Sequence, residues 1–249
     1  MRRLTLALGL TALTALPVAA LDLEAMTQEE RDAFHEEVRA YLLENPEVLL
    51  EAIAVLEARQ AQAQVTADVE LARANAQALF DDPTSWAGGN LDGDITLVEF
   101  IDYRCGFCRR AHPEVAELIA SDGNIRIITK EFPILGEQSV LASRFALAAR
   151  KVGGDDTYKQ VSDALMTMRV DVTDASLERL AEQYDLDLAA IQIEMESDAV
   201  SQIIADNRAL AERLRITGTP TYVLEDQMLR GYVPPDQMRA IVDAVRADG

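Results

Sequence analysis

The sequence predicts an α/β domain that contains a helical insertion and follows a helical N-terminal extension. Three observations lead to this fold class. Residues 95–128 have the pattern strand, helix, strand, which is typical of a parallel crossover unit. Residues 138–214 are mostly helical in pattern, and strand patterns resume only after them. Residues 27–80 carry helical patterns and no strand pattern, so they form a separate extension.

The N-terminus has the pattern of a secretory signal peptide over residues 1–20. A basic start (Met1–Arg3) precedes an apolar run (Leu4–Leu16) and small residues (Val18–Ala20). The run is short for a membrane span, although an uncleaved anchor is the alternative. Cleavage removes two arginines and no acids, which takes the formal charge from −20 to −22. In a bacterium we therefore expect a periplasmic protein, and the charge argues against nucleic-acid partners.

The extension, residues 21–80, is predicted to be an oligomerisation segment. Thr27 and Glu30 form a capping-box pattern, and Pro46 is placed to open a second helix. These helices have too little apolar surface to fold alone, so they pack on their own domain or on other copies. Apolar residues spaced 4-3-4-3 favour self-association: Val65, Val69, Ala72, Ala76 and Leu79.

Residues 81–90 form a turn-rich junction in which Trp86 is expected to plug a boundary. The strand Ile95–Ile101 is apolar on both faces, as in a covered sheet. A helix through Ala120 and a strand from Ile125 to Ile128 follow. We expect insertion helices over Ser139–Val152, Thr157–Met168, Ser176–Tyr184, Leu188–Ser197 and Ala199–Leu214, then a hairpin (Thr221–Leu224, Met228–Tyr232) and a helix from Pro234 to Val245.

Cys105 and Cys108 are the only cysteines in the chain, and a pair at this spacing can be a disulfide staple, part of a zinc site or a redox pair. As a disulfide staple the pair closes a very short loop, worth only about 2 kcal/mol by chain entropy. As a zinc site it lacks two soft ligands, because the only histidines are His35 and His112. A redox role remains the best supported of the three.

The redox role has a mechanism. Cys105 lies where a strand gives way to a helix, and unpaired N–H groups there stabilise a thiolate. Cys105 is therefore expected to attack disulfides and Cys108, one turn later, to resolve the mixed disulfide. Gly106 and Phe107 carry no charge, and Arg104 and Arg109 either assist the thiolate or are solvated surface charges.

Pro220, in Gly218–Thr221, opens a strand next to a turn. Both a cis and a trans peptide bond fit this position. A cis bond would turn the Thr219 backbone outward, where its N–H and C=O can pair with an extended chain.

Four motifs resemble a known family. Leu97–Cys108 and Gly218–Tyr222 resemble DsbA-like proteins of the thioredoxin fold over residues 90–249. With Thr129–Gly136 and the N-terminal Tyr41–Val48, the resemblance narrows to the Com1/ScsC branch of periplasmic thiol–disulfide oxidoreductases.

The resemblance implies that Cys105 is the nucleophile, Cys108 the resolving thiol and Pro220 a cis-proline facing them. It also implies that Glu99 is a buried acid with Lys130 as its partner. Glu99 interrupts an apolar strand, which independently indicates a paired or functional acid. A proton-shuttle role and a purely structural ion pair both remain open.

Two departures from DsbA-like oxidases affect the predicted function. The dipeptide between the cysteines is Gly-Phe instead of one with histidine, and Thr219 resembles disulfide isomerases. We therefore expect a disulfide isomerase or reductase that uses no cofactor and acts on cysteine-containing exported proteins. The expected assembly is a homo-oligomer, a trimer by resemblance, kept reduced by a DsbD/ScsB-like membrane partner. The alternatives are a monomeric oxidase with a DsbB-like partner and a copper-binding or chaperone module of the ScsC type.

Overall fold

The computed structural model describes residues 26–248, so the predicted signal peptide lies outside the described residues. The chain divides into two compact units, Met1–Arg59 and Gln60–Gly249. The unit that contains the sheet spans Gln60–Gly249. Across residues 26–248, every helix is too short or too polar to cross a membrane.

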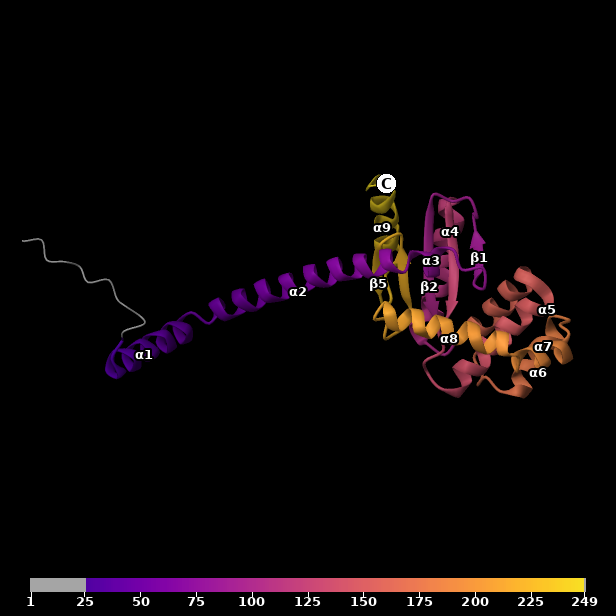
Figure 1. Cartoon of the computed structure of the whole chain (residues 1–249), viewed down its shortest axis with the longest axis horizontal. Helices are drawn as coiled ribbons and strands as arrows, with labels where there is room; N and C mark the ends of the chain where they lie inside the picture. The colour runs from indigo at the N-terminus through magenta and orange to yellow at the C-terminus, as the bar shows by residue number, and fades with distance from the viewer. Residues whose placement is uncertain (1–25, 249) are drawn as a thin grey trace, which may run out of the picture. The chain divides into compact units, whose positions relative to one another are not determined.

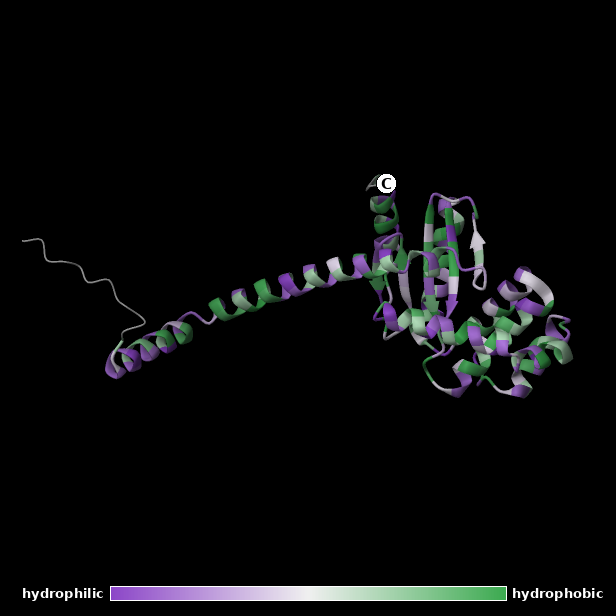
Figure 2. Ribbon diagram, viewed as in Figure 1, coloured by the Kyte–Doolittle hydropathy of each residue, from purple (hydrophilic) through white to green (hydrophobic). Residues whose placement is uncertain are grey.

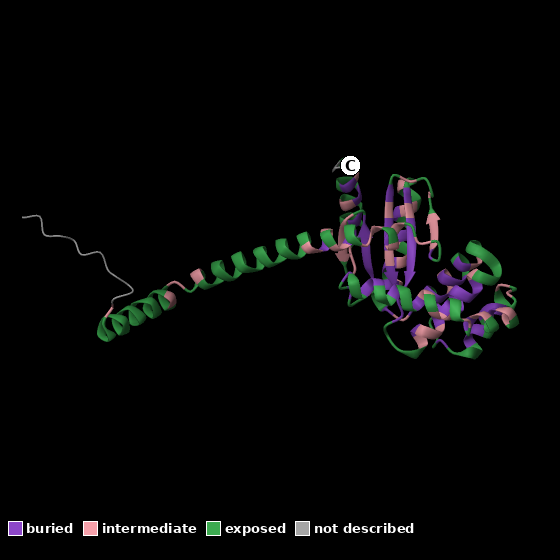
Figure 3. Ribbon diagram, viewed as in Figure 1, coloured by how far each residue is buried: buried purple, intermediate pink, exposed green. Residues whose placement is uncertain are grey.

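The first unit consists of helix α1 (Gln28–Glu44) and the beginning of α2 (Glu47–Ala74). The predicted capping box is present: the Glu30 N–H donates to Thr27 Oγ1 at 3.3 Å, and the Thr27 N–H donates to Glu30 Oε2 at 2.8 Å. No residue of α1 is buried, as Figure 3 shows. Large apolar side chains are exposed along this unit: Phe34, Val38, Tyr41, Leu43, Leu49, Leu50, Ile53, Val55 and Leu56.

The last turns of α2 and the short helix α3 (Ala76–Phe80) belong to the second unit. Ala72 and Leu79 are fully buried there, in a cluster that includes Phe100 of the sheet. The helix is also interrupted at Asn75, between α2 and α3. The predicted self-association seam over Val65–Leu79 is therefore wrong for its C-terminal half, because this unit's own core already covers those residues.

The sheet has five strands in the order β1-β3-β2-β4-β5. Strands β2 (Ile95–Ile101) and β3 (Ile125–Glu131) are parallel, which confirms the predicted crossover. The predicted hairpin is present as β4 (Thr221–Leu224) and β5 (Gln227–Arg230). Strand β1 (Trp86–Gly89) was missed, because its sequence WAGG contains two glycines and no β-branched residue. It pairs with β3 in antiparallel fashion.

Side chains alternate between two covered faces of the sheet. One face, with Leu97 and Ile127, packs against α4 (Gly106–Asp122) and α9 (Pro235–Asp248). The other, with Val98 and Ile128, packs against α3 and α8 (Asp198–Arg213). Figure 2 shows the apolar strands of this central sheet.

The insertion comprises α5 (Glu137–Thr167), α6 (Asp174–Gln183) and α7 (Leu188–Met195), which gather beside one end of the sheet in Figure 1. Helix α5 breaks at Gly154, whose φ of 84° favours glycine. Trp86 stacks on Tyr158 with ring centroids 5.6 Å apart and so joins the sheet to the insertion, as predicted for a junction. The insertion shares one apolar cluster with both cysteines.

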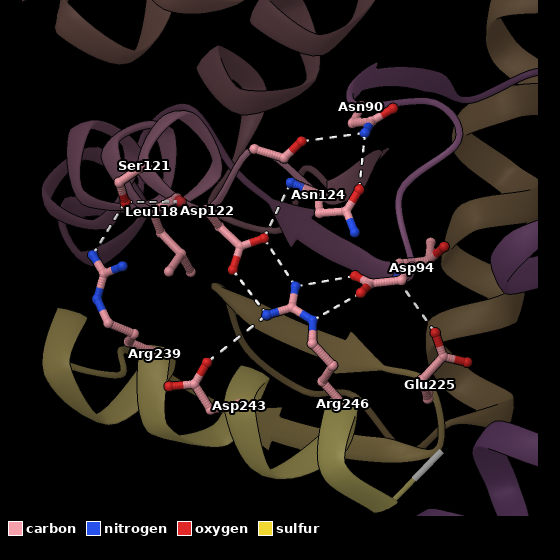
Figure 4. A network of polar contacts seen from close by, with 12 residues as sticks. Asn90, Asp94, Leu118, Ser121, Asp122, Asn124, Glu225, Arg239, Asp243 and Arg246 are labelled. Atoms are coloured by element: carbon pink, nitrogen blue, oxygen red, sulfur yellow. Dashed lines mark hydrogen bonds and ion pairs between the residues drawn. The ribbon is translucent and has the colours of Figure 1, made fainter.

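An arginine network closes one end of the sheet, where β2 begins. Arg246 of α9 donates from Nε to Asp94 Oδ2 at 2.9 Å and from Nη2 to Asp122 Oδ1 at 2.9 Å (Figure 4). The guanidinium beside Asp122 lowers the pKa of that carboxyl group. Cys105 caps the N-terminus of α4, and Asp122 is the last residue of this helix. The cysteines therefore lie at the other end of the sheet, where β2 ends.

Candidate active site

Cys105 is the N-cap residue of α4, directly after the loop that leaves β2. Its backbone N–H donates to Asp102 O at 3.0 Å, and its carbonyl accepts from the Arg109 N–H at 3.0 Å. The hydrogen bond from the Cys108 thiol is the largest influence on the pKa of Cys105. The Thr219 side chain and the backbone N–H groups of Cys108 and Phe107 act in the same direction, and together these groups lower the pKa of Cys105 to about 5, although partial burial opposes them. At neutral pH the sulfur is a thiolate.

Cys108 has the opposite electrostatic environment. Its hydrogen bond to Cys105 and its burial raise the pKa of the Cys108 thiol far above its ordinary value. Cys108 is 2% exposed and Cys105 7% exposed, so Cys105 is the more accessible of two buried sulfurs. Both are free thiols in this structure. The pair thus combines an ionised sulfur with a protonated one beneath it.

The loop before β4 faces Cys105. The Thr219–Pro220 peptide bond is cis, which resolves the alternative that the sequence left open. The Cys105 Sγ lies 3.1 Å from Thr219 O. Thr221 Oγ1 donates to Gly218 O at 2.9 Å, and the Gly231 N–H donates to Pro220 O at 2.9 Å. The sheet therefore presents the Thr219 backbone beside the nucleophilic sulfur.

The predicted Glu99–Lys130 pair is wrong. Glu99 lies opposite Thr129 in the register of β2 and β3, and Lys130 lies opposite Phe100, so the two side chains are on different faces of the sheet. Lys130 is 1% exposed and donates from Nζ to Asp82 Oδ2 at 2.5 Å. Its partner is thus a carboxylate after α3, on the face away from the cysteines.

Glu99 instead accepts a hydrogen bond from Thr129 Oγ1 at 2.9 Å. Burial raises the pKa of the Glu99 carboxyl group, and this hydrogen bond opposes the shift. Glu99 and His112 both line a cavity of about 270 Å³ behind α4. His112 itself has its Nε2 2.8 Å from Asp163 Oδ1 at the rim, which agrees with a packing role.

Tyr222 lies beside Glu99 in the sheet, on the strand that follows the cis bond at Pro220. It is 1% exposed and lies directly across from Glu99 in the pairing of β2 and β4. Burial raises the pKa of the Tyr222 hydroxyl, and the charges of Glu99 and Cys108 raise it further. Glu99 and Cys108 therefore both lie close enough to Tyr222 to affect its ionisation.

Sequence reasoning missed Asp102. Its side chain is fully buried and accepts three backbone N–H bonds, from Arg104 at 2.8 Å, Ile134 at 2.8 Å and Leu135 at 3.0 Å. These bonds connect the cysteine loop to the segment after β3. The available signal was an acid directly after an apolar strand and three residues before a cysteine.

Glu131 was also missed. It is 1% exposed and accepts from Tyr103 at 2.6 Å, Tyr158 at 2.6 Å and Ser143 at 2.7 Å. Burial raises the pKa of Glu131 to about 7 in spite of these three donors. The signal was a glutamate at the end of an apolar strand, although its partners come from distant segments.

Arg104 and Arg109 do not contact the sulfur. Arg104 pairs with Asp171 at 3.1 Å, and Arg109 Nε donates to Met166 O at 2.8 Å, so both join the cysteine loop to the insertion. Phe107, between the cysteines, is 60% exposed and stacks on Tyr232 with centroids 6.4 Å apart.

Comparison with protein families gives two matches. The model of the DSBA-like thioredoxin domain matches residues 96–243, more than half of the chain. The model of the copper resistance protein ScsC N-terminal domain matches residues 30–63. The second match covers α1 and the first half of α2.

Solved structures of similar fold cover both units. A thioredoxin-like oxidoreductase from Silicibacter pomeroyi is 41% identical with a TM-score of 0.64, over 69% of this chain and 97% of its own. Proteus mirabilis ScsC in a transitional conformation is 28% identical with a TM-score of 0.66, over 92% of this chain and 100% of its own. Salmonella enterica Typhimurium BcfH is 27% identical with a TM-score of 0.74, over 88% and 96%.

Curated relatives include a Na(+)/H(+) antiporter NhaA of Salinispora arenicola, 27% identical over 159 residues. The match covers 64% of this chain but only 24% of that protein, so the chain spans about a quarter of its length. Disulfide bond formation protein D of Bacillus subtilis is 23% identical over 62% of this chain and 74% of its own. By the two family matches and the 41%-identical structure, the chain belongs to the DsbA-like thioredoxin-domain family of thiol–disulfide oxidoreductases, in its ScsC branch.

Proposed function

We propose that this protein exchanges disulfides in exported proteins, with Cys105 as nucleophile and Cys108 as resolving thiol. The observation that carries the proposal is the placement of the pair: Cys105 is the N-cap of α4, Cys108 lies one turn later, and Thr219 O, before the cis bond to Pro220, is 3.1 Å from Cys105 Sγ. In this placement the pKa of Cys105 is lowered to about 5, and that of Cys108 is raised. A thiolate attacks disulfides, whereas a protonated neighbour stays inactive until a mixed disulfide forms.

The electrons balance in two steps. The Cys105 thiolate attacks a substrate disulfide, forms a mixed disulfide and releases one substrate thiolate. Cys108 then loses its proton and attacks Cys105 Sγ, which forms the Cys105–Cys108 disulfide and releases the second substrate thiolate. In isomerisation, another substrate cysteine attacks the mixed disulfide instead and regenerates the Cys105 thiolate, with no net electron transfer.

Three further residues have roles in this proposal. Thr219 presents its backbone to the extended substrate chain, and Pro220 holds that backbone beside Cys105. Glu99 accepts the proton that Cys108 loses. The pKa of the Glu99 carboxyl group is raised, and Glu99 and Cys108 both lie close enough to Tyr222 to affect its pKa. Lys130 has no part in the exchange, because it lies on the opposite face with Asp82.

We place the protein among isomerases or reductases that act as homo-oligomers, with a trimer as the expected number. The large apolar side chains exposed on α1 and on the beginning of α2 support self-association, because among the described residues none of α1 is buried. We propose that this apolar surface binds the same surface of other copies of the chain. The match of residues 30–63 to the ScsC N-terminal domain supports an ScsC-like role for this segment. Several sites facing one substrate suit disulfide shuffling.

The expected compartment is the periplasm. One similar structure is a periplasmic thioredoxin-like protein from Salmonella enterica, 29% identical over 69% of this chain. Cysteine-containing exported proteins are then the substrates, and a DsbD/ScsB-like membrane protein supplies electrons to keep Cys105 and Cys108 reduced.

A paired ribonuclease assay tests the direction of exchange. We expect the reduced protein to restore activity to scrambled ribonuclease faster than the oxidised protein restores it to reduced ribonuclease. The reverse order would assign the protein to the runner-up class, monomeric oxidases with a DsbB-like partner. Cys105→Ser should abolish both activities, and activity in that variant would overturn the proposal.

A second candidate is copper(I) binding, favoured by the match to a copper resistance domain and by two thiols spaced one helical turn apart. Titration of the reduced protein with copper(I) beside Cys105→Ser tests it. Binding that survives the substitution excludes the cysteine pair as the sole ligand set.

A further inference from the structure

The segment that carries Thr219 is irregular between the end of α8 and β4. One end of it is fixed by the hydrogen bond from the Gly231 N–H to Pro220 O, at 2.9 Å. Its other end contains Leu214, the C-cap of α8, and Arg215, which has a φ of 54°. Carbonyls at a helix C-terminus lack helical partners and must be satisfied by other donors.

Arg230 supplies these donors. It lies on β5 opposite Thr221, so its guanidinium is directed toward the start of the Thr219 segment. Its Nη1 donates to Arg215 O at 2.6 Å, and its Nη2 donates to Leu214 O at 3.1 Å. One side chain therefore fixes the backbone where the segment leaves α8.

Asp68 orients the Arg230 guanidinium. Its carboxylate accepts from Arg230 Nη2 at 2.7 Å and from Nε at 3.2 Å, the two-pronged geometry in which arginine is most restricted. The Asp68 side chain is only 8% exposed, and Gln64 Nε2 donates to its Oδ1 at 2.7 Å. Asp68 lies on α2, upstream of the residues that match the catalytic-domain model, which begins at residue 96.

We propose that Asp68 and Arg230 are positioning residues for the thiol-exchange site: they hold the Thr219 segment in the place where its backbone contacts the Cys105 sulfur. The contacts run from Asp68 to Arg230, from Arg230 to the carbonyls of Leu214 and Arg215, and along the segment to Thr219 O, 3.1 Å from Cys105 Sγ. The proposal rests on the role of Cys105 proposed above.

A neighbouring ion pair provides a matched control. Arg73 Nη2 donates to Asp226 Oδ2 at 2.5 Å and also joins α2 to the β4–β5 hairpin. It differs in two respects: the Arg73 side chain is 71% exposed, and it contacts no carbonyl of the Thr219 segment. Loss of this pair weakens the same contact between α2 and the hairpin without releasing the segment.

The test is the titration of Cys105 in the full chain, followed by thiolate absorbance and by iodoacetamide labelling against pH. Because a hydrogen bond from the Thr219 side chain helps to lower the pKa of Cys105, release of the segment that carries Thr219 should raise that pKa. We expect Arg230→Met to raise it by about one unit, a tenfold slower labelling at pH 4, and Asp68→Asn to raise it by a smaller amount. Arg73→Met should leave the titration unchanged.

The outcomes separate the proposal from simpler explanations. A purely structural role predicts a lower melting temperature for Asp68→Asn with a wild-type Cys105 titration, and that result would overturn the inference. An equal shift in Arg73→Met would overturn it as well. If Arg230→Met does not fold, the Cys105 titration of Asp68→Asn tests the proposal on its own. If wild-type Cys105 titrates near the free-cysteine value of about 8.5, the proposed function fails instead.

Discussion

Thr129 donates its hydroxyl to Glu99 at 2.9 Å, on the face of the sheet that α4 and the cysteines cover. Lys130, the next residue, points to the other face and pairs with Asp82. Burial raises the pKa of the Glu99 carboxyl group, and the Thr129 hydroxyl and the charges of His112 and Lys159 oppose this shift. A carboxyl group whose pKa is raised holds a proton more readily than one in a tight ion pair.

Substitution of Glu99 should slow the resolving step. In Glu99→Gln we expect thiol release from a preformed Cys105–glutathione mixed disulfide to fall by about 10²-fold, because Cys108 loses its proton acceptor. Rapid-quench measurement of glutathione release reports this step alone. Cys105 labelling by iodoacetamide should stay unchanged.

Thr129→Val is the matched control for Glu99. It keeps the carboxyl group but removes the hydroxyl that stabilises its anion, so the pKa of Glu99 should rise and the pH profile of thiol release should move to higher pH. A wild-type release rate in Glu99→Gln would exclude the proton-acceptor role.

Variants that lack one cysteine should differ in whether they accumulate a mixed disulfide with substrate. Cys108→Ala should accumulate mixed disulfides with substrate, and Cys105→Ala should not, because only Cys105 is ionised at neutral pH. Non-reducing electrophoresis after acid quench measures the adducts. Adducts on Cys108 in the Cys105→Ala variant would reverse the assigned roles.

Glu131 should make the protein less stable as pH rises. Burial raises its pKa from 4.5 to about 7 in the folded protein. Between these values the unfolded chain releases a proton that the folded protein keeps, so the free energy of unfolding falls with pH, by up to about 3 kcal/mol.

Glu131→Gln should remove this pH dependence. Its Oε1 can accept from Tyr103 and Tyr158, and its amide can donate to Ser143, so the contacts are conserved in number. Urea unfolding between pH 4.5 and 7.5 measures the difference. Ser143→Ala, which removes one donor to the carboxylate, should keep the dependence and extend it to higher pH, because the pKa of Glu131 rises further. The same pH dependence in all three proteins would refute the prediction.

The exposed apolar residues of the first unit should support self-association. Light scattering on residues 21–249 at micromolar concentration should give a trimer, and Ile53→Asp should give a monomer, since it places a charge among Leu49, Leu56 and their equivalents in other copies. Gln60→Asp, at an exposed polar position of α2, is the control. A wild-type monomer would contradict the assembly and favour the monomeric oxidase.

The parallel strands β2 and β3 with their crossover helix, the β4–β5 hairpin and the cysteine site were predictable because their signals are local. An apolar run marks β2, two cysteines one turn apart mark the start of α4, and a proline after Thr219 marks β4. The residues around Pro220 left the cis and trans peptide bonds open, and only the family resemblance implied the cis form that the structure has.

Most of the missed features depend on strand register or on partners that are distant in the sequence. A shift of one residue moves a strand side chain to the other face, which is why Glu99 and Lys130 were wrongly paired. Asp68 and Arg230 are 162 positions apart, and no spacing rule connects them. Strand β1 is too short and glycine-rich to have a pattern of its own.

The antiparallel pairing of β1 with β3 has a practical consequence for work on the isolated catalytic unit. A recombinant fragment that starts at residue 90 would leave the outer side of β3 as an open edge, a template for aggregation. It would also lack the partners of Lys130 and Arg230, which are Asp82 and Asp68. Fragments intended for activity measurements should therefore begin no later than Gln60.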